Sequence, residues 1–141
     1  MSAAVIEPRG RQLGRSVAAV VLGFFATAAL SMAVDVVLHQ TGVFPPWGQV
    51  MSDGLFALAT AYRVAFTIAG GYLTARLAPD RPVRHALILG AIGTVAALIG
   101  AVATWNANLG PHWYPLALVL TAMPAVWAGG WLRARSAVPA R

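Results

Sequence analysis

Four long apolar segments, separated by short polar stretches, dominate the pattern along the chain. The first has no charged residue from Val17 to Val34 and stays apolar as far as Leu38. A helix rises about 1.5 Å per residue, so about 20 apolar residues cross the roughly 30 Å of hydrocarbon in a bilayer. The pattern therefore predicts an all-α fold, a four-span transmembrane helical bundle. The expected spans are residues 17–38, 55–77, 86–105 and 116–132.

Proline, glycine and polar residues separate the spans. The stretches 39–54 and 106–115 are rich in glycine and proline, so we expect loops there. Residues 1–16 and 133–141 are polar and are expected to be tails, the first disordered or lying on the membrane surface. Pro124 lies inside the fourth span and predicts a kink, because proline has no backbone N–H to donate to the helix.

The arginines favour one orientation in the membrane. Nine of the ten basic residues lie in the two tails and in the segment joining the second and third spans, whereas loops 39–54 and 106–115 have none. Short loops rich in arginine stay in the cytoplasm. We therefore expect two antiparallel hairpins in a bacterial inner membrane, with both termini cytoplasmic and the arginines at the lipid headgroups. These residues are Arg9, Arg11, Arg15, Arg76, Arg81, Arg84, Arg133, Arg135 and Arg141.

Composition agrees with a membrane protein and excludes several other classes. Of the 141 residues, 59% are hydrophobic and 10% are charged, and the mean hydropathy is +0.71. A soluble domain has about 25% charged residues, so a cytosolic enzyme and a disordered tail are both excluded. The net charge of +6 is accounted for by topology, so the expected partner is the lipid bilayer and no nucleic acid. Without cysteine, the chain has no disulfide, Cys-ligated zinc or iron–sulfur cluster.

Small residues recur at intervals of four in the spans. Since lipid is as apolar as leucine, helices in a membrane associate through the close approach that small residues permit. We expect such packing at Gly23, Thr27, Ser31, Thr67, Gly71, Gly100 and Gly129.

Arg63 is the one basic residue that topology does not explain. It lies eight residues into the second span, where an unpaired charge costs at least about 2.5–3.5 kcal/mol. Asp35 lies near the corresponding end of the first span, so we expect an Arg63–Asp35 pair inside the bundle. His39, Tyr62 and His112 are expected at the same level, where they would line an outward-facing polar cavity. Two interpretations stay open: the pair only fixes helix register, or it forms an anion, proton or substrate site.

Other chemistry finds little support in the sequence. Asp35 and His39 share a helix face, but two ligands are too few for a metal, and the histidines lie at span ends rather than facing each other as haem ligands would. The serines lack a Gly-x-Ser-x-Gly context. A signal peptide cleaved after Ala33 is disfavoured, because the apolar run continues past that point. We therefore expect no cofactor, no metal and no enzymatic activity.

Several short runs carry a resemblance to a known group of proteins. The last 85 residues of the chain contain Ala61-Tyr62-Arg63, Gly70-Gly71-Tyr72, Ala75-Arg76-Leu77-Ala78-Pro79, Arg84-His85-Ala86 and Gly110-Pro111-His112-Trp113-Tyr114-Pro115. Over about the last 85 residues the chain resembles small bacterial four-helix integral membrane proteins that have no assigned activity. The resemblance implies a membrane bundle and carries no activity over to this chain.

Two hypotheses for function follow from these features. The first is a membrane protein without catalytic chemistry, an accessory, assembly or helix-packing component that joins a larger membrane complex. The second is a small oligomeric transporter or channel that uses an intramembrane Arg63–Asp35 site. A membrane enzyme comes third. A cavity reaching Arg63 favours the transporter, and a dry Arg63–Asp35 pair favours the component of a complex.

Overall fold

Four helices make up most of residues 9–137, which are the residues that the computed structural model describes. Their bounds are α1 Arg9–Gln40, α2 Asp53–Leu77, α3 Pro82–Thr104 and α4 Trp113–Ser136. Each is long and apolar enough to cross a membrane. The predicted all-helical fold with four candidate spans is confirmed, and it is typical of a multi-pass membrane protein.

The helices extend beyond the apolar segments that predicted them, most of all α1 and α4. Residues 9–16, expected to be part of a tail, form the first turns of α1, and α4 continues past residue 132 to Ser136. Hydropathy marks the part of a helix that tolerates lipid, whereas arginine is a good helix former and prolongs the helix beyond it. Arg141 and the remaining tail residues 1–8 and 138–141 lie outside the described residues.

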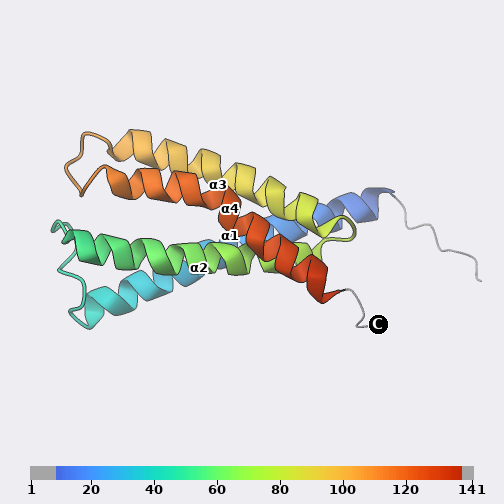
Figure 1. Cartoon of the computed structure of the whole chain (residues 1–141), viewed down its shortest axis with the longest axis horizontal. Coiled ribbons are helices and arrows are strands. Elements are labelled where there is room, and N and C mark those ends of the chain that lie inside the picture. The colour runs from blue at the N-terminus through green and yellow to red at the C-terminus, as the bar shows by residue number, and fades with distance from the viewer. Residues whose placement is uncertain (1–8, 138–141) are drawn as a thin grey trace, which may run out of the picture.

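The connections alternate between the two ends of the bundle. Figure 1 shows the segments between α1 and α2 and between α3 and α4 at one end, here called the loop end. The turn between α2 and α3 lies at the other end, together with the start of α1 and the end of α4. We call this second end the turn end.

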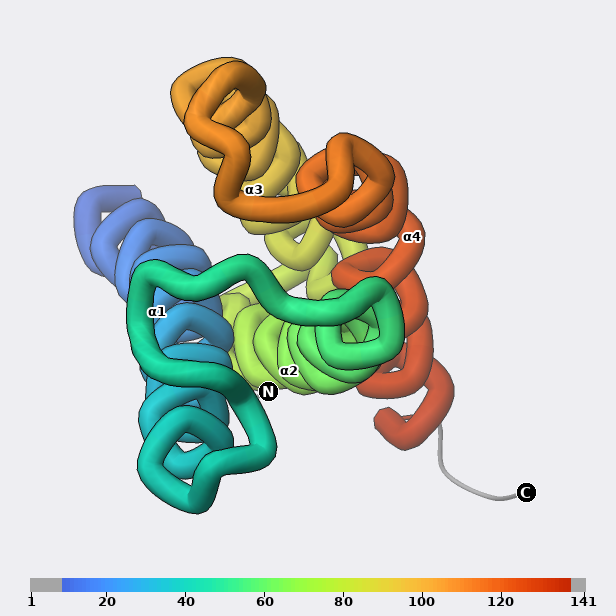
Figure 2. The backbone as a smooth tube through the Cα atoms, turned by 90° about the vertical axis from the view of Figure 1, so that its left-hand side faces the viewer, coloured from blue at the N-terminus to red at the C-terminus, as the bar shows by residue number. Residues whose placement is uncertain are grey.

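Helix α2 is at the centre of the arrangement. It contacts α1, α3 and α4, whereas α1 and α4 do not contact each other within the described residues. Viewed from the loop end, α1 and α4 lie on opposite sides of α2, and α3 lies beside α4 (Figure 2). At this end α1 and α3 are well separated in both views.

Two pairs of adjacent glycines join the helices. A Cβ on Gly70 would meet the backbone oxygen of Gly23 in α1 at 3.1 Å, and a Cβ on Gly71 would meet that of Val126 in α4 at 2.5 Å. Gly129 and Gly130 of α4 likewise approach α2 and α3. Adjacent helical residues point about 100° apart, so a glycine pair can pack against two neighbouring helices at once.

Threonine hydroxyls reinforce the contact between α1 and α2. Thr74 of α2, which is completely buried, donates to the carbonyl of Ala19 in α1 over 3.2 Å. Thr27 of α1 donates to Gly23 over 2.9 Å and lies 3.4 Å from the carbonyl of Phe66 in α2. These bonds and the glycine contacts hold α1 and α2 together over the middle of the bundle.

The expected packing residues fall into three groups in the structure. Gly23, Thr27, Gly71 and Gly129 lie at contacts between helices. Ser31 and Thr67 line a cavity, and Thr67 donates to the carbonyl of Arg63 in its own helix. Gly100 contacts no other helix of the described chain, because a Cβ there would meet no atom within 4 Å. A small residue permits close approach, but α3 has no neighbour against that position.

Helix α4 changes direction near its middle (Figure 1), where Pro124 lies. Proline cannot donate the backbone bond that would hold the turn before it, which is the usual cause of such a bend. Residues of α4 on both sides of Pro124 line the cavity described next, and the contacts of Gly129 and Gly130 with α2 and α3 lie beyond Pro124 toward the end of α4.

Candidate functional site

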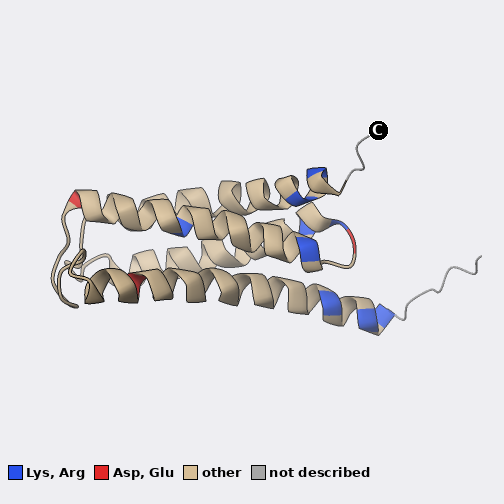
Figure 3. Ribbon diagram, turned by 90° about the horizontal axis from the view of Figure 1, so that it is seen from below, with Lys and Arg blue, Asp and Glu red and all other residues tan. Residues whose placement is uncertain are grey.

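An ion pair lies part-way along the bundle, away from the other charges. Figure 3 shows basic positions gathered at the turn end, and opposite charges on α1 and α2 along the length of the helices. These are Asp35, near the end of α1, and Arg63, in the first half of α2.

Each carboxylate oxygen of Asp35 accepts a hydrogen bond from a side chain of α2. Arg63 donates from Nη2 to Asp35 Oδ2, and the Tyr62 hydroxyl donates to Asp35 Oδ1. The Asp35 side chain is 13% exposed and that of Arg63 is 31% exposed. Both oxygens of the acceptor are therefore used, and its charge is balanced by the arginine beside it.

Arg63 retains unused donors. Its guanidinium has five N–H groups, of which the contact with Asp35 uses only part. The Nε atom is buried and has no hydrogen-bond partner among the described residues. The guanidinium carbon lies 5.8 Å from the centre of the Tyr62 ring, within the range of a cation–π contact. Tyr114 of α4 is near enough to interact electrostatically with both Arg63 and Asp35.

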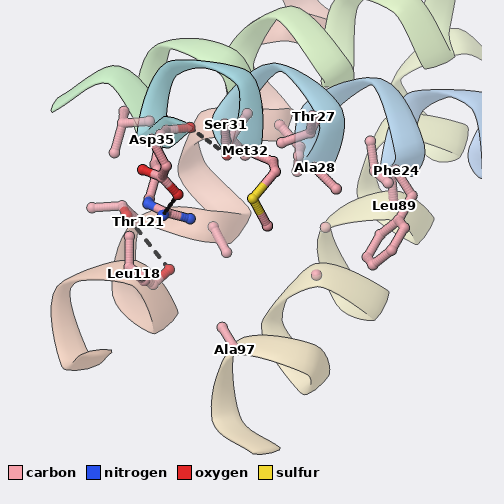
Figure 4. Close-up of a pocket in the computed structure, with 17 residues that line it drawn as sticks. Phe24, Thr27, Ala28, Ser31, Met32, Asp35, Leu89, Ala97, Leu118 and Thr121 are labelled. Atoms are coloured by element: carbon pink, nitrogen blue, oxygen red, sulfur yellow. Dashed lines mark hydrogen bonds and ion pairs between the residues drawn. The ribbon is translucent and has the colours of Figure 1, made fainter. Parts of the chain in front are cut away.

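The ion pair lies at the edge of a cavity between the helices. The cavity has a volume of about 380 Å³, and all four helices line it. In Figure 4, Asp35 and Thr121 lie toward one side of this space and Phe24 and Leu89 toward the other, with the Met32 side chain between them. A cavity of this size falls within the range of small-molecule sites.

The hydroxyl groups around the cavity are mostly occupied. Thr27, Thr67 and Thr121 each donate to a backbone carbonyl in their own helix. Ser31 also lines the cavity. Since the threonine protons are already used, Arg63 is the main source of free hydrogen-bond donors at this site.

The two loop-end histidines do not join the ion pair. His39 Nδ1 lies 2.6 Å from the carbonyl of Pro45, and the ring stacks on Trp47 with 3.7 Å between centres. His112 Nε2 lies 3.0 Å from the carbonyl of Trp105, on which the ring also stacks. Neither histidine lines the cavity beside the ion pair, because each imidazole is held against its own loop.

A second cavity of about 290 Å³ lies between α3, the start of α4 and Phe56 of α2. His112 and Tyr114 line it, and the Phe56 ring lies 4.9 Å from that of Tyr114. Gly100 lines it as well. The small residues of α3 that suggested close packing thus border open space.

The described residues contain no group of three or more His, Asp or Glu side chains that could hold a metal ion. Asp35 is taken up by Arg63 and Tyr62, and Asp53 accepts from Trp113 Nε1 over 3.3 Å.

Sequence reasoning missed some residues that matter to the site. The sequence gives no sign that Tyr114 lies near Arg63, because this proximity follows only from the way α4 packs on α2. Gly70 and Gly130 fall outside the fourfold spacing that identified the other glycines. The doublets Gly70-Gly71 and Gly129-Gly130 were the available signal.

The chain was compared with family models, curated proteins and solved structures, and none of them matches it. A function for this protein therefore rests on the cavity and on the ion pair at its edge.

Proposed function

We propose that the chain is a multi-pass protein of the bacterial inner membrane, with two antiparallel hairpins and both termini in the cytoplasm. The support is the clustering of arginines at the turn end, which also contains the start of α1 and the end of α4 (Figure 3). Arginines in short segments are retained in the cytoplasm, so this end would face inward.

The orientation can be tested cleanly because the chain has no cysteine. Gln49→Cys places a thiol on the loop end, and Asp80→Cys places one in the turn between α2 and α3; both positions are exposed. In spheroplasts or right-side-out inner-membrane vesicles, an impermeant maleimide added from outside should label Gln49→Cys. Asp80→Cys should react only after permeabilisation, and the reverse pattern would contradict the orientation.

We propose further that this protein is a small membrane transporter whose solute site is the cavity at Arg63 and Asp35. The observation that carries this proposal is the open volume of about 380 Å³ beside the charged pair. If the ion pair only fixed helix register, we would expect the helices to pack closely around it, because the small residues on their facing sides permit close approach. Here the small residues Gly93 and Ala97 of α3 border the cavity instead.

The packing suggests how access to the site would be controlled. The contacts of Gly23, Gly70, Gly71 and Gly129 bring backbones together on the side of the cavity nearer the turn end. On the other side, α1 and α3 separate toward the loop end (Figure 2). A solute at Arg63 would thus meet a closed bundle on the cytoplasmic side, and its passage would require these helix contacts to separate.

A second candidate is an accessory or assembly component of a membrane complex. It is favoured by the uncovered small residues of α3, because Cβ atoms at Gly93 and Gly100 would meet nothing within 4 Å. A helix from a second copy or from another protein would then fill the cavity. The two candidates therefore make opposite predictions about whether the space is free in the membrane.

The experiment is purification in a mild detergent, followed by mass spectrometry and a thermal-stability screen against small cations, anions and uncharged solutes. The transporter proposal expects the chain alone or as a homo-oligomer, with a stabilising solute that also crosses proteoliposome membranes. Gly93→Leu should remove that stabilisation by filling the cavity. A stoichiometric protein partner, with no solute that distinguishes the wild type from Gly93→Leu, would support the accessory component instead.

A further inference from the structure

The donors and acceptors around the cavity define the ligand that it would take. Asp35 already accepts from Arg63 and Tyr62, and the three threonine hydroxyls donate to backbone carbonyls. The unused donor groups at the cavity are those of the Arg63 guanidinium and the Ser31 hydroxyl, and the guanidinium carries only donors. A matching ligand must supply an acceptor group, and a negatively charged acceptor makes the stronger hydrogen bond.

The rest of the cavity wall is mainly apolar, so the same ligand is expected to have an apolar part. Phe24, Met32 and Leu89 extend from the ion pair toward the far side of the cavity (Figure 4). Apart from Asp35 and Arg63, no charged residue lines this space. A small hydrophilic anion would leave this apolar surface uncovered, whereas a chain of methylene groups would cover it.

The arrangement of the helices provides a sideways entrance. Helices α1 and α4 do not contact each other among the described residues, and α1 and α3 lie apart at the loop end (Figure 2). Met32 of α1 and Gly93 of α3 both line the cavity. Met32 is exposed, and a Cβ at Gly93 would meet no atom within 4 Å, so the cavity opens to the surface of the bundle here. In a bilayer, this side of the bundle faces the hydrocarbon of the leaflet at the loop end.

We propose that the cavity binds an anionic amphiphile, a carboxylate- or phosphate-bearing molecule with a hydrocarbon chain, which enters sideways from the bilayer. The anionic group pairs with Arg63, and the chain lies along Phe24, Met32 and Leu89. This inference rests on the proposed transport function and specifies the class of its substrate. The free acid and the headgroup of an anionic lipid share this chemistry.

Native mass spectrometry of the full chain, released from detergent micelles, counts bound ligands directly. The probes are dodecanoate, dodecan-1-ol of equal chain length and the dodecyltrimethylammonium cation. Dodecanoate should bind at least about tenfold more tightly than the other two, because only it forms a charged hydrogen bond with Arg63. Equal binding of dodecanoate and the alcohol, or preferred binding of the cation, would overturn the proposal.

A second pair of probes separates the two sources of the ligand. Delipidated protein is given phosphatidylglycerol or phosphatidylcholine, which differ in net charge. Selective retention of phosphatidylglycerol identifies a membrane lipid as the ligand, and binding of dodecanoate alone identifies a free acid. Failure to bind either anion selectively would contradict the inference.

Variants test whether Arg63 and the cavity form the site. Arg63→Gln should weaken dodecanoate binding by about tenfold or more, whereas Asp35→Asn should strengthen it by freeing the guanidinium. Weaker anion binding in a folded Asp35→Asn variant would overturn the proposed pairing. These two variants alter the ion pair and therefore need a check of folding.

A third variant leaves the ion pair unchanged, so it tests whether the cavity is the binding site even if Arg63→Gln does not fold. Gly93→Leu fills the cavity at a position with no neighbour within 4 Å and should abolish selective dodecanoate binding. Gly100→Leu is its matched control, since it lies on the same helix but lines the second cavity. Unchanged dodecanoate binding by Gly93→Leu would exclude this cavity as the site.

The outcomes also separate this inference from the transport function on which it rests. If a different class of solute binds in the cavity and is transported, the amphiphile proposal fails and the transporter stands. If no solute of any class distinguishes the wild type from Gly93→Leu, both fail.

Discussion

Replacing Gly71 with alanine should push α2 and α4 apart. A Cβ at this position would lie 2.5 Å from the backbone oxygen of Val126 and 2.8 Å from its Cα. Side-chain carbons essentially never lie within 3.0 Å of such atoms, so the backbone of α4 must move by about 0.5 Å or more. Because the obstacle is backbone, rotation of a flexible side chain cannot relieve the clash.

The expected cost follows from the loss of packing. A gap of 0.5–1 Å forfeits about a quarter to a half of the van der Waals attraction between the surfaces that it separates. Overpacking of this kind costs about 1–3 kcal/mol, against which alanine gains at most about 1 kcal/mol in helix propensity. We therefore expect a net loss of about 1–2 kcal/mol in the free energy of unfolding.

The assay is reversible unfolding in mixed micelles, followed by circular dichroism as the denaturing detergent is increased. Gly93→Ala and Gly100→Ala are matched controls, because each adds the same methyl group to a helix at a position with no neighbour within 4 Å. They should be neutral or up to about 1 kcal/mol more stable than the wild type. If Gly71→Ala is as stable as these controls, the close contact between α2 and α4 does not exist.

A double substitution checks that one interface is involved. A Cβ at Gly129 of α4 would lie 2.6 Å from the backbone nitrogen of Tyr72 in α2, on the same interface as Gly71. Once one methyl group has separated the helices, the second meets less resistance. The double variant should therefore lose clearly less stability than the two single variants together, and strict additivity would refute a shared displacement.

Three further substitutions test other contacts. Asp35→Asn should lower the free energy of unfolding by about 1–2 kcal/mol, because Arg63 loses its charged partner. Asp53→Asn removes an exposed 3.3 Å contact and should change that free energy by less than about 1 kcal/mol. Equal effects of the two substitutions in chemical unfolding would contradict this prediction. Thr74→Val should lower the free energy of unfolding by about 0.6 kcal/mol, because the hydrogen bond to Ala19 in α1 is lost. Thr104→Val, whose hydrogen bond stays within its own helix, should be nearly neutral in the same assay. His39→Ala should speed hydrogen exchange in residues 41–50, because the ring no longer holds Pro45 and Trp47, and unchanged exchange would show that the imidazole does not brace the loop.

The number and approximate place of the helices could be predicted because membrane spans depend on a local property. An apolar run of about 20 residues needs no knowledge of its neighbours to be recognised, and the glycine–proline stretches mark the breaks between runs. The ends of α1 and α4 were less predictable, because arginine continues a helix that has already left the apolar segment.

The charged pair was predictable for a similar reason. Arg63 stands out as a basic residue well inside α2, and Asp35 is the acid at the corresponding level of α1; a charge in lipid needs such a partner. The pairing of Tyr62 with Asp35 is harder to foresee, since a tyrosine beside an arginine also suits a membrane interface. The contribution of Tyr114 depends on α4 lying against α2, which the order of residues does not specify.

The sequence alone determined the helical class, the spans and the presence of a buried charge that requires an opposite charge, because each follows from the cost of placing a group in lipid. Only the tertiary structure decided which small residues touch and which border open space. Gly71 and Gly100 are the same residue type in similar apolar helices, yet one meets the backbone of α4 and the other meets nothing. The difference arises from the angles at which the helices diverge, which depend on all their contacts together and also create the cavity at Arg63.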